Sequence, residues 1–253
     1  MTLYQFGILC ITTFFSCIIK TGAGIGSGLF VVPVLSLAFP TKVALGISAP
    51  MMFFSDFVSL RLYWKEWTEW RVARDLFIGA VAGLTLGAFL ITLIPPPAFR
   101  LGLGVFALCF STWQLGRMFV FPPKGGGGKT LGERHPYLDK ALMFTVGVFG
   151  GIASALAHSG GLVWSTYMVT KARKRSFVAS LMLMFAASNT YKIITFLGID
   201  ILQWKDILWV MGTFPVILLG SWIGNTLNRK ISVRHFRMVV FVIIFILGVS
   251  LLV

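Results

Sequence analysis

Long apolar segments separated by short basic clusters make up almost the whole chain. Six of these segments are close to the length of about 20 residues that a helix needs to cross a bilayer. They cover residues 43–63, 76–94, 101–121, 176–198, 206–228 and 236–253. This pattern predicts an all-α polytopic membrane protein with six full spans.

Two further apolar stretches are interrupted by small residues. The stretch 3–39 is broken at residues 20–28, which are rich in glycine, and the stretch 141–170 is broken at residues 157–161. We expect each stretch to form two short helices that meet at the break. Each pair would then enter and leave the membrane on one side, as a helical hairpin.

The composition supports a membrane location. The chain has 253 residues, of which 57% are hydrophobic and 12% charged, whereas about 25% are charged in an ordinary soluble domain. A soluble domain of this size has no means of burying 24 Phe and 8 Trp spread along the chain. The net charge of +14 alone would suggest a nucleic-acid binder. In so apolar a chain we expect the lipid bilayer as the partner, and no nucleic acid.

The two halves of the chain resemble each other. A polar linker, residues 122–138, separates a first transmembrane repeat, residues 1–121, from a second, residues 139–253. Residues recur at a constant offset of 133: Gly28 with Gly161, Asp56 with Asn189, and Ser59 with Lys192. The shared order and spacing predict a duplication, each repeat being a Gly-broken hairpin plus three transmembrane helices.

The distribution of Lys and Arg predicts that these repeats are inverted. Of the 22 basic residues, 17 fall in four connections: 61–75, 117–140, 171–175 and 229–237. Basic loops face the cytoplasm, and all four can do so only if the second repeat is inverted relative to the first. The alternative is eight ordinary spans in parallel repeats. It would leave the eight basic residues of 171–175 and 229–237 on the outer face.

Four ionisable residues lie inside apolar stretches: Lys20, Asp56, His158 and Lys192. Such groups are costly in a membrane and are functional hypotheses by default. Two lysines against one aspartate leave the region net positive, which suits an anion. Asp56 and Ser59, like Asn189 and Lys192, are three positions apart and share a helical face. The two polar faces can therefore converge at the centre of the molecule.

Structural roles are the alternatives for these residues. Asp56 and Lys192 can form a buried ion pair with no other role. Lys20 can extend its ammonium toward the membrane surface. A single buried histidine such as His158 is commonly a satisfied core residue.

The two glycine-rich breaks are candidates for anion cradles. Free N–H groups at a helix start bind anions, and the helix dipole assists them. The residues that would form the cradles are Thr21, Gly24, Gly26 and Ser27 in the first break, and Ser159 and Gly160 beside His158 in the second. Close helix packing is the alternative role for the glycines, and we expect it for Gly79, Gly83 and Gly87.

Enzyme motifs are absent from the sequence. It contains no GxGxxG after a strand, no Walker sequence, no HExxH and no GxSxG. We therefore expect no catalytic residue, no metal site and no cofactor. Without an ATP-binding module, transport would be secondary or channel-like.

The first glycine-rich break begins the run Lys20-Thr21-Gly22-Ala23-Gly24-Ile25-Gly26-Ser27-Gly28-Leu29-Phe30-Val31-Val32-Pro33. This run resembles the first glycine-rich motif of the sulfite exporter TauE/SafE family. Ala44-Leu45-Gly46-Ile47-Ser48 and the helix start at Trp70-Arg71 fit the same pattern. The chain departs from it at Ser27, and at Thr166, which stands where Pro33 stands in the first motif. The resemblance implies a bacterial inner-membrane anion transporter. Family members are associated with export of sulfite, sulfoacetate and related organosulfonates.

Our hypothesis is therefore a secondary exporter of a small sulfur-containing anion, bound near mid-membrane between two inverted repeats. Lys20, Lys192, His158 and the glycine amides would bind the anion. Hydrogen bonds would come from Thr21, Ser27, Ser59, Ser159 and Asn189. Asp56 would orient a lysine or carry a coupling proton.

Three other functions are compatible with the sequence. One is a channel-like permease for another small carboxylate or inorganic anion. The second is a membrane-embedded enzyme using His158 and Ser159, and the third is a structural protein with a dry, fully packed centre. The glycine-rich helix faces also fit a homodimer.

Overall fold

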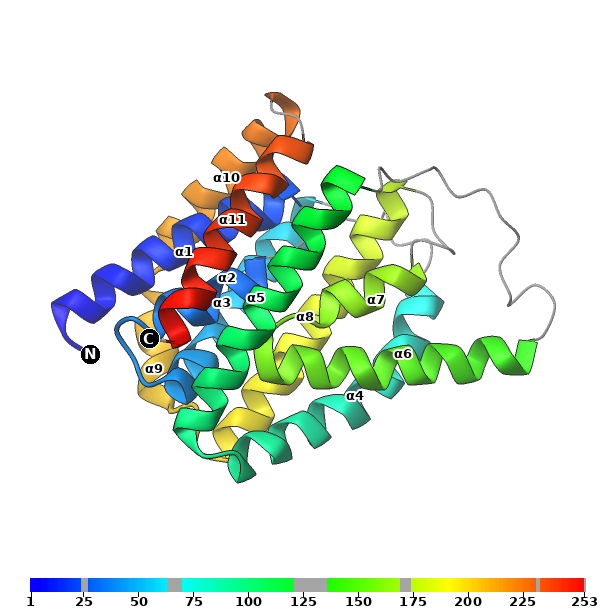
Figure 1. Cartoon of the computed structure of the whole chain (residues 1–253), viewed down its shortest axis with the longest axis horizontal. Helices are drawn as coiled ribbons and strands as arrows, with labels where there is room; N and C mark the ends of the chain where they lie inside the picture. Colours follow the sequence, from blue (N-terminus) through cyan, green and yellow to red (C-terminus); the bar gives the residue numbers. More distant parts are fainter. Residues whose placement is uncertain (24–26, 63–69, 121–135, 169–173, 231–232, 253) are drawn as a thin grey trace.

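The computed structural model describes residues 1–23, 27–62, 70–120, 136–168, 174–230 and 233–252, and these residues form helices without any strand (Figure 1). The helices of the first half are α1 (Leu3–Ala23), α2 (Ser27–Leu35), α3 (Thr41–Leu62), α4 (Trp70–Leu93) and α5 (Pro96–Val120). Those of the second half are α6 (Pro136–Ala157), α7 (Gly160–Met168), α8 (Lys174–Gly198), α9 (Trp204–Met211), α10 (Phe214–Lys230) and α11 (Val233–Leu252). The all-α prediction is confirmed.

Six of the described helices are long and apolar enough to cross a membrane: α1, α3, α4, α5, α6 and α8. Four of them coincide with predicted spans. The predicted span 236–253 falls on α11, whose apolar part is the shorter segment Met238–Leu252. Of the predicted linker 122–138, residues 122–135 lie outside the described residues, and the last three residues already belong to α6.

The prediction of one continuous helix over 206–228 is wrong. The chain forms α9 and α10, which are bent by 53° relative to each other. Pro215 explains the break, because it has no N–H to donate to the carbonyl of Met211 and its ring would clash with that carbonyl. The hydroxyl of Thr213 donates to the carbonyl of Val210 at 2.7 Å and satisfies an acceptor at the end of α9.

We predicted two short helices in each glycine-broken stretch. This is wrong for the helix before each break, which is long. α1 has 21 residues and α6 has 22, whereas α2 and α7 have nine each. No proline interrupts α1, and in α6 the only proline is its first residue, a position that tolerates one. α1 also begins with a capping box, in which Thr2 and Gln5 exchange backbone-to-side-chain hydrogen bonds of 3.2 and 2.9 Å.

Each short helix brings the chain back toward the start of its long partner. The side chain of Gln5, near the start of α1, donates to the carbonyl of Ala38, just after α2, at 3.2 Å. In the second half the hydroxyl of Tyr167, near the end of α7, donates to the carboxylate of Asp139 in the first turn of α6 at 2.8 Å. Both stretches are therefore helical hairpins that begin and end at the same end of the molecule.

Glycines let two pairs of helices pack closely, each across the two halves. A Cβ on Gly79 or Gly83 of α4 would overlap the carbonyl of Phe144 or Val148 on α6. The packing role predicted for Gly79, Gly83 and Gly87 is thus confirmed. In the second pair a Cβ at Gly220 of α10 would lie 2.7 Å from the carbonyl of Phe14 on α1, and one at Gly224 would meet Ile18 and Thr21. Residue numbers rise together in both pairs, so both pairs are parallel.

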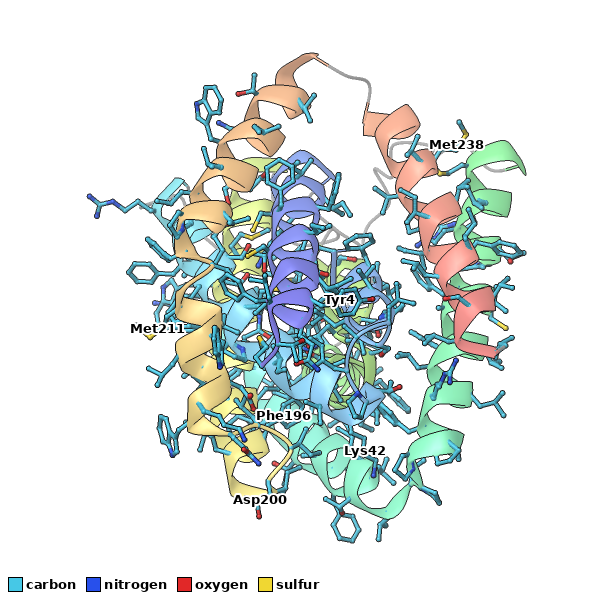
Figure 2. The ribbon with its side chains drawn as sticks, turned by 90° about the vertical axis from the view of Figure 1, so that its left-hand side faces the viewer. Tyr4, Lys42, Phe196, Asp200, Met211 and Met238 are labelled. Atoms are coloured by element: carbon cyan, nitrogen blue, oxygen red, sulfur yellow. The ribbon has the colours of Figure 1, made fainter. Side chains whose placement is uncertain are left out.

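The remaining large interfaces complete the bundle. α5 and α11 pack antiparallel, since Gly104 contacts Leu252 while Leu108 contacts Gly248. α3 and α8 pack against each other and together carry nine of the 19 buried polar side chains in the described part of the chain. Figure 2 shows Lys42 and Asp200 at one end of the molecule and Met238 toward the other.

Candidate functional site

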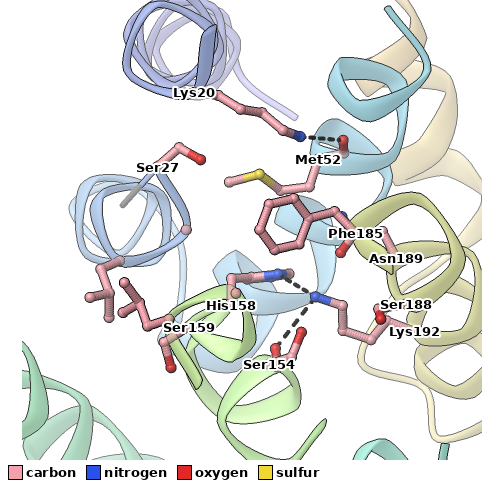
Figure 3. Close-up of a pocket in the computed structure, with 14 residues that line it drawn as sticks. Lys20, Ser27, Met52, Ser154, His158, Ser159, Phe185, Ser188, Asn189 and Lys192 are labelled. Carbon is pink, nitrogen blue, oxygen red and sulfur yellow. Dashed lines mark hydrogen bonds between the residues drawn. The ribbon is translucent and has the colours of Figure 1, made fainter. Parts of the chain in front are cut away.

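A cavity of about 40 Å³, lined largely by buried residues, lies between the start of α2 and the turn that joins α6 and α7 (Figure 3). Residues of α1, α2, α3, α6, α7 and α8 and the turn between α6 and α7 surround it. Its polar lining residues are Lys20, Ser27, Ser154, His158, Ser159, Ser188, Asn189 and Lys192. A purely structural protein would have a dry, fully packed centre. The polar cavity counts against that alternative.

Six residues that the sequence singled out line this cavity: Lys20, Ser27, His158, Ser159, Asn189 and Lys192. Asp56 lies directly behind Lys20 and Asn189, and its side chain is fully buried. The structure thus brings together residues of both sequence halves.

Other candidates lie elsewhere. The hydroxyl of Thr21 donates to the carbonyls of Cys17 and of Ser221, so Thr21 faces α10. Ser59 donates to the carbonyl of Ser55 within α3 at 2.9 Å. Gly160 packs against the carbonyl of Gly150 and the side chain of Ser154. Gly24 and Gly26 lie outside the described residues.

Lys20 and Asp56 form a buried ion pair, with side chains 3% and 0% exposed. Asn189 donates to the second carboxylate oxygen of Asp56 at 2.6 Å. Lys20 also donates to the carbonyl of Met52 at 3.4 Å, so its ammonium does not extend to the membrane surface. The predicted Asp56–Lys192 pair is not the one that forms, because α1 brings Lys20 to the carboxylate.

Lys192 is buried, at 1% exposure, and has no carboxylate partner in the described part of the chain. Its ammonium donates to Nδ1 of His158 at 2.6 Å and to the carbonyl of Ser154 at 3.4 Å. Ion pairs within 4.0 Å join Lys20 to Asp56 and Arg74 to Asp75. An ammonium has three N–H donors, so one of them has no acceptor in the described part of the chain. Because Asp56 neutralises Lys20, a protonated Lys192 gives the site one net positive charge.

A short hydrogen-bond chain holds the ring of His158. Its Nε2 lies 2.6 Å from the hydroxyl of Ser48, and that hydroxyl donates to the carbonyl of Leu45 at 2.6 Å. Since the carbonyl only accepts, Ser48 accepts from Nε2–H, and Nδ1 is left to accept from Lys192. The imidazole is therefore neutral and has a defined tautomer.

The two short helices begin at the cavity. The first three residues of α2, Ser27 to Leu29, line it, as do Gly161 and Leu162 at the start of α7. A Cβ on Gly28 would overlap the carbonyl of His158, so glycine is needed for α2 to approach the second break. The positive ends of two helix dipoles and the ammonium of Lys192 thus line the same cavity.

Sequence reasoning missed Phe185, Ser188, Ser154 and Ser48. Phe185, Ser188, Asn189 and Lys192 follow the three- and four-residue spacing of one face of α8, so helical periodicity could have added the first two. Phe185 lies under the ammonium of Lys20, whose nitrogen is 5.9 Å from the ring centroid. Nothing in the sequence pairs Ser48 with His158, 110 residues away.

A second cavity of about 500 Å³ adjoins the first. It is lined almost entirely by apolar residues of α5, α6 and α7. Ser159 lines both cavities, and its hydroxyl donates to the carbonyl of Ala153 at 3.0 Å. Ser159 therefore marks the boundary between the polar and the apolar space.

The fold and the site together define a multi-pass helical membrane protein with a central cavity lined by Lys20, His158 and Lys192. The model of the sulfite exporter TauE/SafE family matches residues 9–251. The chain belongs to this family and is a membrane transporter. It is 22% identical over 251 residues to the probable membrane transporter protein YunE of Bacillus subtilis (strain 168), covering 90% of each chain. No solved structure matches the chain significantly.

Proposed function

We propose that this protein is a secondary transporter that exports a small sulfur-containing anion, such as sulfite or a sulfoacetate-like organosulfonate. The single observation that carries the proposal is the buried ammonium of Lys192, which lines the cavity without a carboxylate partner among the described residues. A buried cation without a counter-ion is costly. An anion in the cavity would supply the missing charge and accept the third N–H.

The cavity suits a small anion. A water molecule needs about 10–15 Å³ of such space, so a cavity of about 40 Å³ holds a few waters or one compact oxyanion. Hydroxyls of Ser27, Ser159 and Ser188 and the amide of Asn189 surround it. The starts of α2 and α7 add two helix N-termini, which favour sulfonate, sulfite or carboxylate groups.

The two halves act as inverted repeats in this proposal. α1 packs parallel to α10, and α6 packs parallel to α4. These two pairs are equivalent if α1 of the first repeat corresponds to α6 of the second, and if α4 corresponds to α9 and α10 together. The described starts of α4 and α9 carry the matching pairs Trp70-Arg71 and Trp204-Lys205. Asp56 and Asn189, 133 positions apart, meet where α3 crosses α8. Inverted repeats of this kind commonly hold their substrate near mid-membrane, which supports a site between the two halves.

The four basic connections would face the cytoplasm of the inner membrane. α4 and α6 begin at the same end, and Tyr167 brings the end of α7 back to the start of α6. α11 is antiparallel to α5, so α11 begins where α5 ends. In this proposal the helix ends that flank connections 61–75, 117–140, 171–175 and 229–237 share one end of the bundle. Their 17 Lys and Arg favour the cytoplasmic side.

Transport by purified protein in proteoliposomes tests the proposal. Labelled sulfite and sulfoacetate should enter vesicles, and preloading with unlabelled anion should accelerate entry, as expected of a carrier. Lys192→Gln should reduce the initial rate at least about tenfold, equivalent to about 1.4 kcal/mol. Lys205→Gln, the same change at an exposed lysine of α9, should transport normally.

Each alternative outcome has a distinct meaning. Equal transport by Lys192→Gln and the wild type would remove Lys192 from the mechanism. Flux without acceleration by preloaded anion, together with a conductance in planar bilayers, would indicate the channel-like permease. Transport of acetate or sulfate in place of the sulfur anions would correct the substrate class.

A further inference from the structure

We propose that His158 carries a proton across the membrane together with the anion, so that the protein is a proton–anion symporter. This inference rests on the proposed transport of an anion through the central cavity. Its basis is the position of His158, whose ring touches Lys192 on one side and Ser48 on the other while it lines the cavity.

The empty site holds Nδ1 of His158 as a hydrogen-bond acceptor. Ser48 and the carbonyl of Leu45 keep the proton of the neutral ring on Nε2. Figure 3 shows the ammonium of Lys192 directed at the ring and at the carbonyl of Ser154. In this state the lone pair of Nδ1 accepts an N–H of Lys192 and is not open to a proton.

Proton uptake at Nδ1 requires that Lys192 turn away. Without an anion, a proton on Nδ1 would set the N–H of His158 against the N–H of Lys192. The two positively charged groups would then lie side by side, because Nζ and Nδ1 are 2.6 Å apart. An anion in the cavity can accept the N–H of Lys192 and thereby release the lone pair of Nδ1. A proton from the adjoining aqueous phase then forms the Nδ1–H bond, and this N–H donates to the anion.

Binding of the anion therefore favours binding of the proton at His158, and binding of the proton favours binding of the anion. One anion and one proton enter from the same side, and on the other side the Nδ1–H bond breaks as both leave and Lys192 returns to Nδ1. For a monoanion the charge of the loaded site equals that of the empty site, because the two charges cancel. The transported unit is then electroneutral. Export runs on the outward gradient of the anion, with one proton leaving per anion, whereas an imposed inward proton gradient drives the same cycle toward uptake.

The other charged groups around His158 are less suited to this role. The carboxylate of Asp56 on α3 is separated from the cavity by Lys20 of α1 and Asn189 of α8. These two residues contact one carboxylate oxygen each. Lys20 is neutralised by that carboxylate. Lys192 of α8 is the donor that must turn toward the anion. This leaves His158 as the group whose acceptor atom becomes free when the anion arrives.

The backbone at His158 can transmit its change of state. His158 has a left-handed φ of 50° at the turn that joins α6 and α7, and its carbonyl and Cβ pack against Gly28 at the start of α2. A shift of the ring or its backbone therefore reaches the short helices of both halves.

The experiment measures protons and anions in the same vesicles. Labelled sulfite, sulfoacetate, sulfate and acetate are first tested for exchange, and the transported anion is then used. Internal pH is followed with pyranine, with the voltage clamped by potassium and valinomycin and with protein-free vesicles as the blank. The wild type should take up about one proton per anion, and an inward proton gradient should drive accumulation of the anion.

Variants assign the proton to a residue. His158→Asn, chosen because Asn tolerates a left-handed backbone, should lower the proton-to-anion ratio to near zero at whatever rate it transports. Asp56→Asn should keep the ratio near one. If this variant does not fold, the double variant Lys20→Met/Asp56→Asn replaces it, since it removes both charges of the pair.

The outcomes separate the two proposals. Net uptake of the anion by the wild type without uptake of protons overturns symport and leaves the proposed function standing. A ratio near one in His158→Asn, or its loss in the Asp56 variant alone, overturns the assignment to His158. Absence of exchange of all four anions rejects the proposed function and the symport with it.

Discussion

The side-chain amide of Asn189 donates a 2.6 Å hydrogen bond to the carboxylate of Asp56, and the two residues are 133 positions apart, at matching places in the two sequence halves. Asp56 is a carboxylic acid, and Asn189 is the corresponding amide. Two carboxylates would repel each other at this separation, whereas an amide can donate. The crossing of α3 and α8 thus pairs unlike residues and holds a single negative charge.

We predict that Asn189→Ala destabilises the protein by about 1–3 kcal/mol, the cost of leaving a buried acceptor without its donor. Thermal unfolding in detergent, followed by intrinsic fluorescence, measures the change in Tm. Ser188→Ala is the matched control. It alters the neighbouring residue of α8, whose buried hydroxyl has no partner among the described residues, so its Tm should change little. An unchanged Tm in Asn189→Ala would contradict the importance of the bond.

The Lys20–Asp56 pair makes a second prediction, because both side chains are almost fully buried. Lys20→Met or Asp56→Asn alone should cost about 3–5 kcal/mol, since each leaves an unpaired buried charge. The double variant should recover most of that loss. The same unfolding measurement tests this, and single variants as stable as the wild type would show that the pair is dispensable.

A third prediction concerns the glycines that join the two halves. Gly83→Ala should lower Tm, because the added Cβ would overlap the backbone carbonyl of Val148 and force α4 away from α6. Gly116→Ala on α5 is the control, since a Cβ there meets nothing within 4 Å. That substitution should be neutral or stabilise the helix by up to about 1 kcal/mol. Equal effects of the two changes would argue against close packing at Gly83.

The proposed topology can be tested by cysteine labelling. In a variant without the three native cysteines, single cysteines at Glu66 and Ala172 should react with an impermeant thiol reagent only when the cytoplasmic face is accessible. A cysteine at Gln203, exposed before α9, should react from outside. Labelling of Glu66→Cys and Ala172→Cys from opposite faces would exclude the inverted arrangement.

Several helices could be predicted from the chain because their causes are local. Runs of about 20 apolar residues define α3, α4, α5 and α8. The break between α9 and α10 also has a local cause in Pro215. The length of α1 and α6, which the prediction of short helices got wrong, is local as well. No proline lies within either apolar run before its break, so each helix continues up to that break.

The residues of the site were predictable in kind but not in pairing. Lys20, Asp56, His158 and Lys192 stand out in sequence as ionisable groups in apolar surroundings. Which lysine meets Asp56 depends on how α1 lies against α3, and that is settled by contacts between residues far apart in the chain. The same holds for Ser48, which reaches His158 only because α3 passes beside the second break.

The sequence alone determined that this is an all-helical membrane protein with two glycine-broken hairpins, since hydrophobic length and glycine content act locally. It also determined that few charges are buried and that most are positive. Only the tertiary structure decided that Asp56 neutralises Lys20 and that Lys192 is left facing a cavity beside His158. Buried charges pair with what lies within a few ångströms, and helix packing, not order along the chain, decides what lies there.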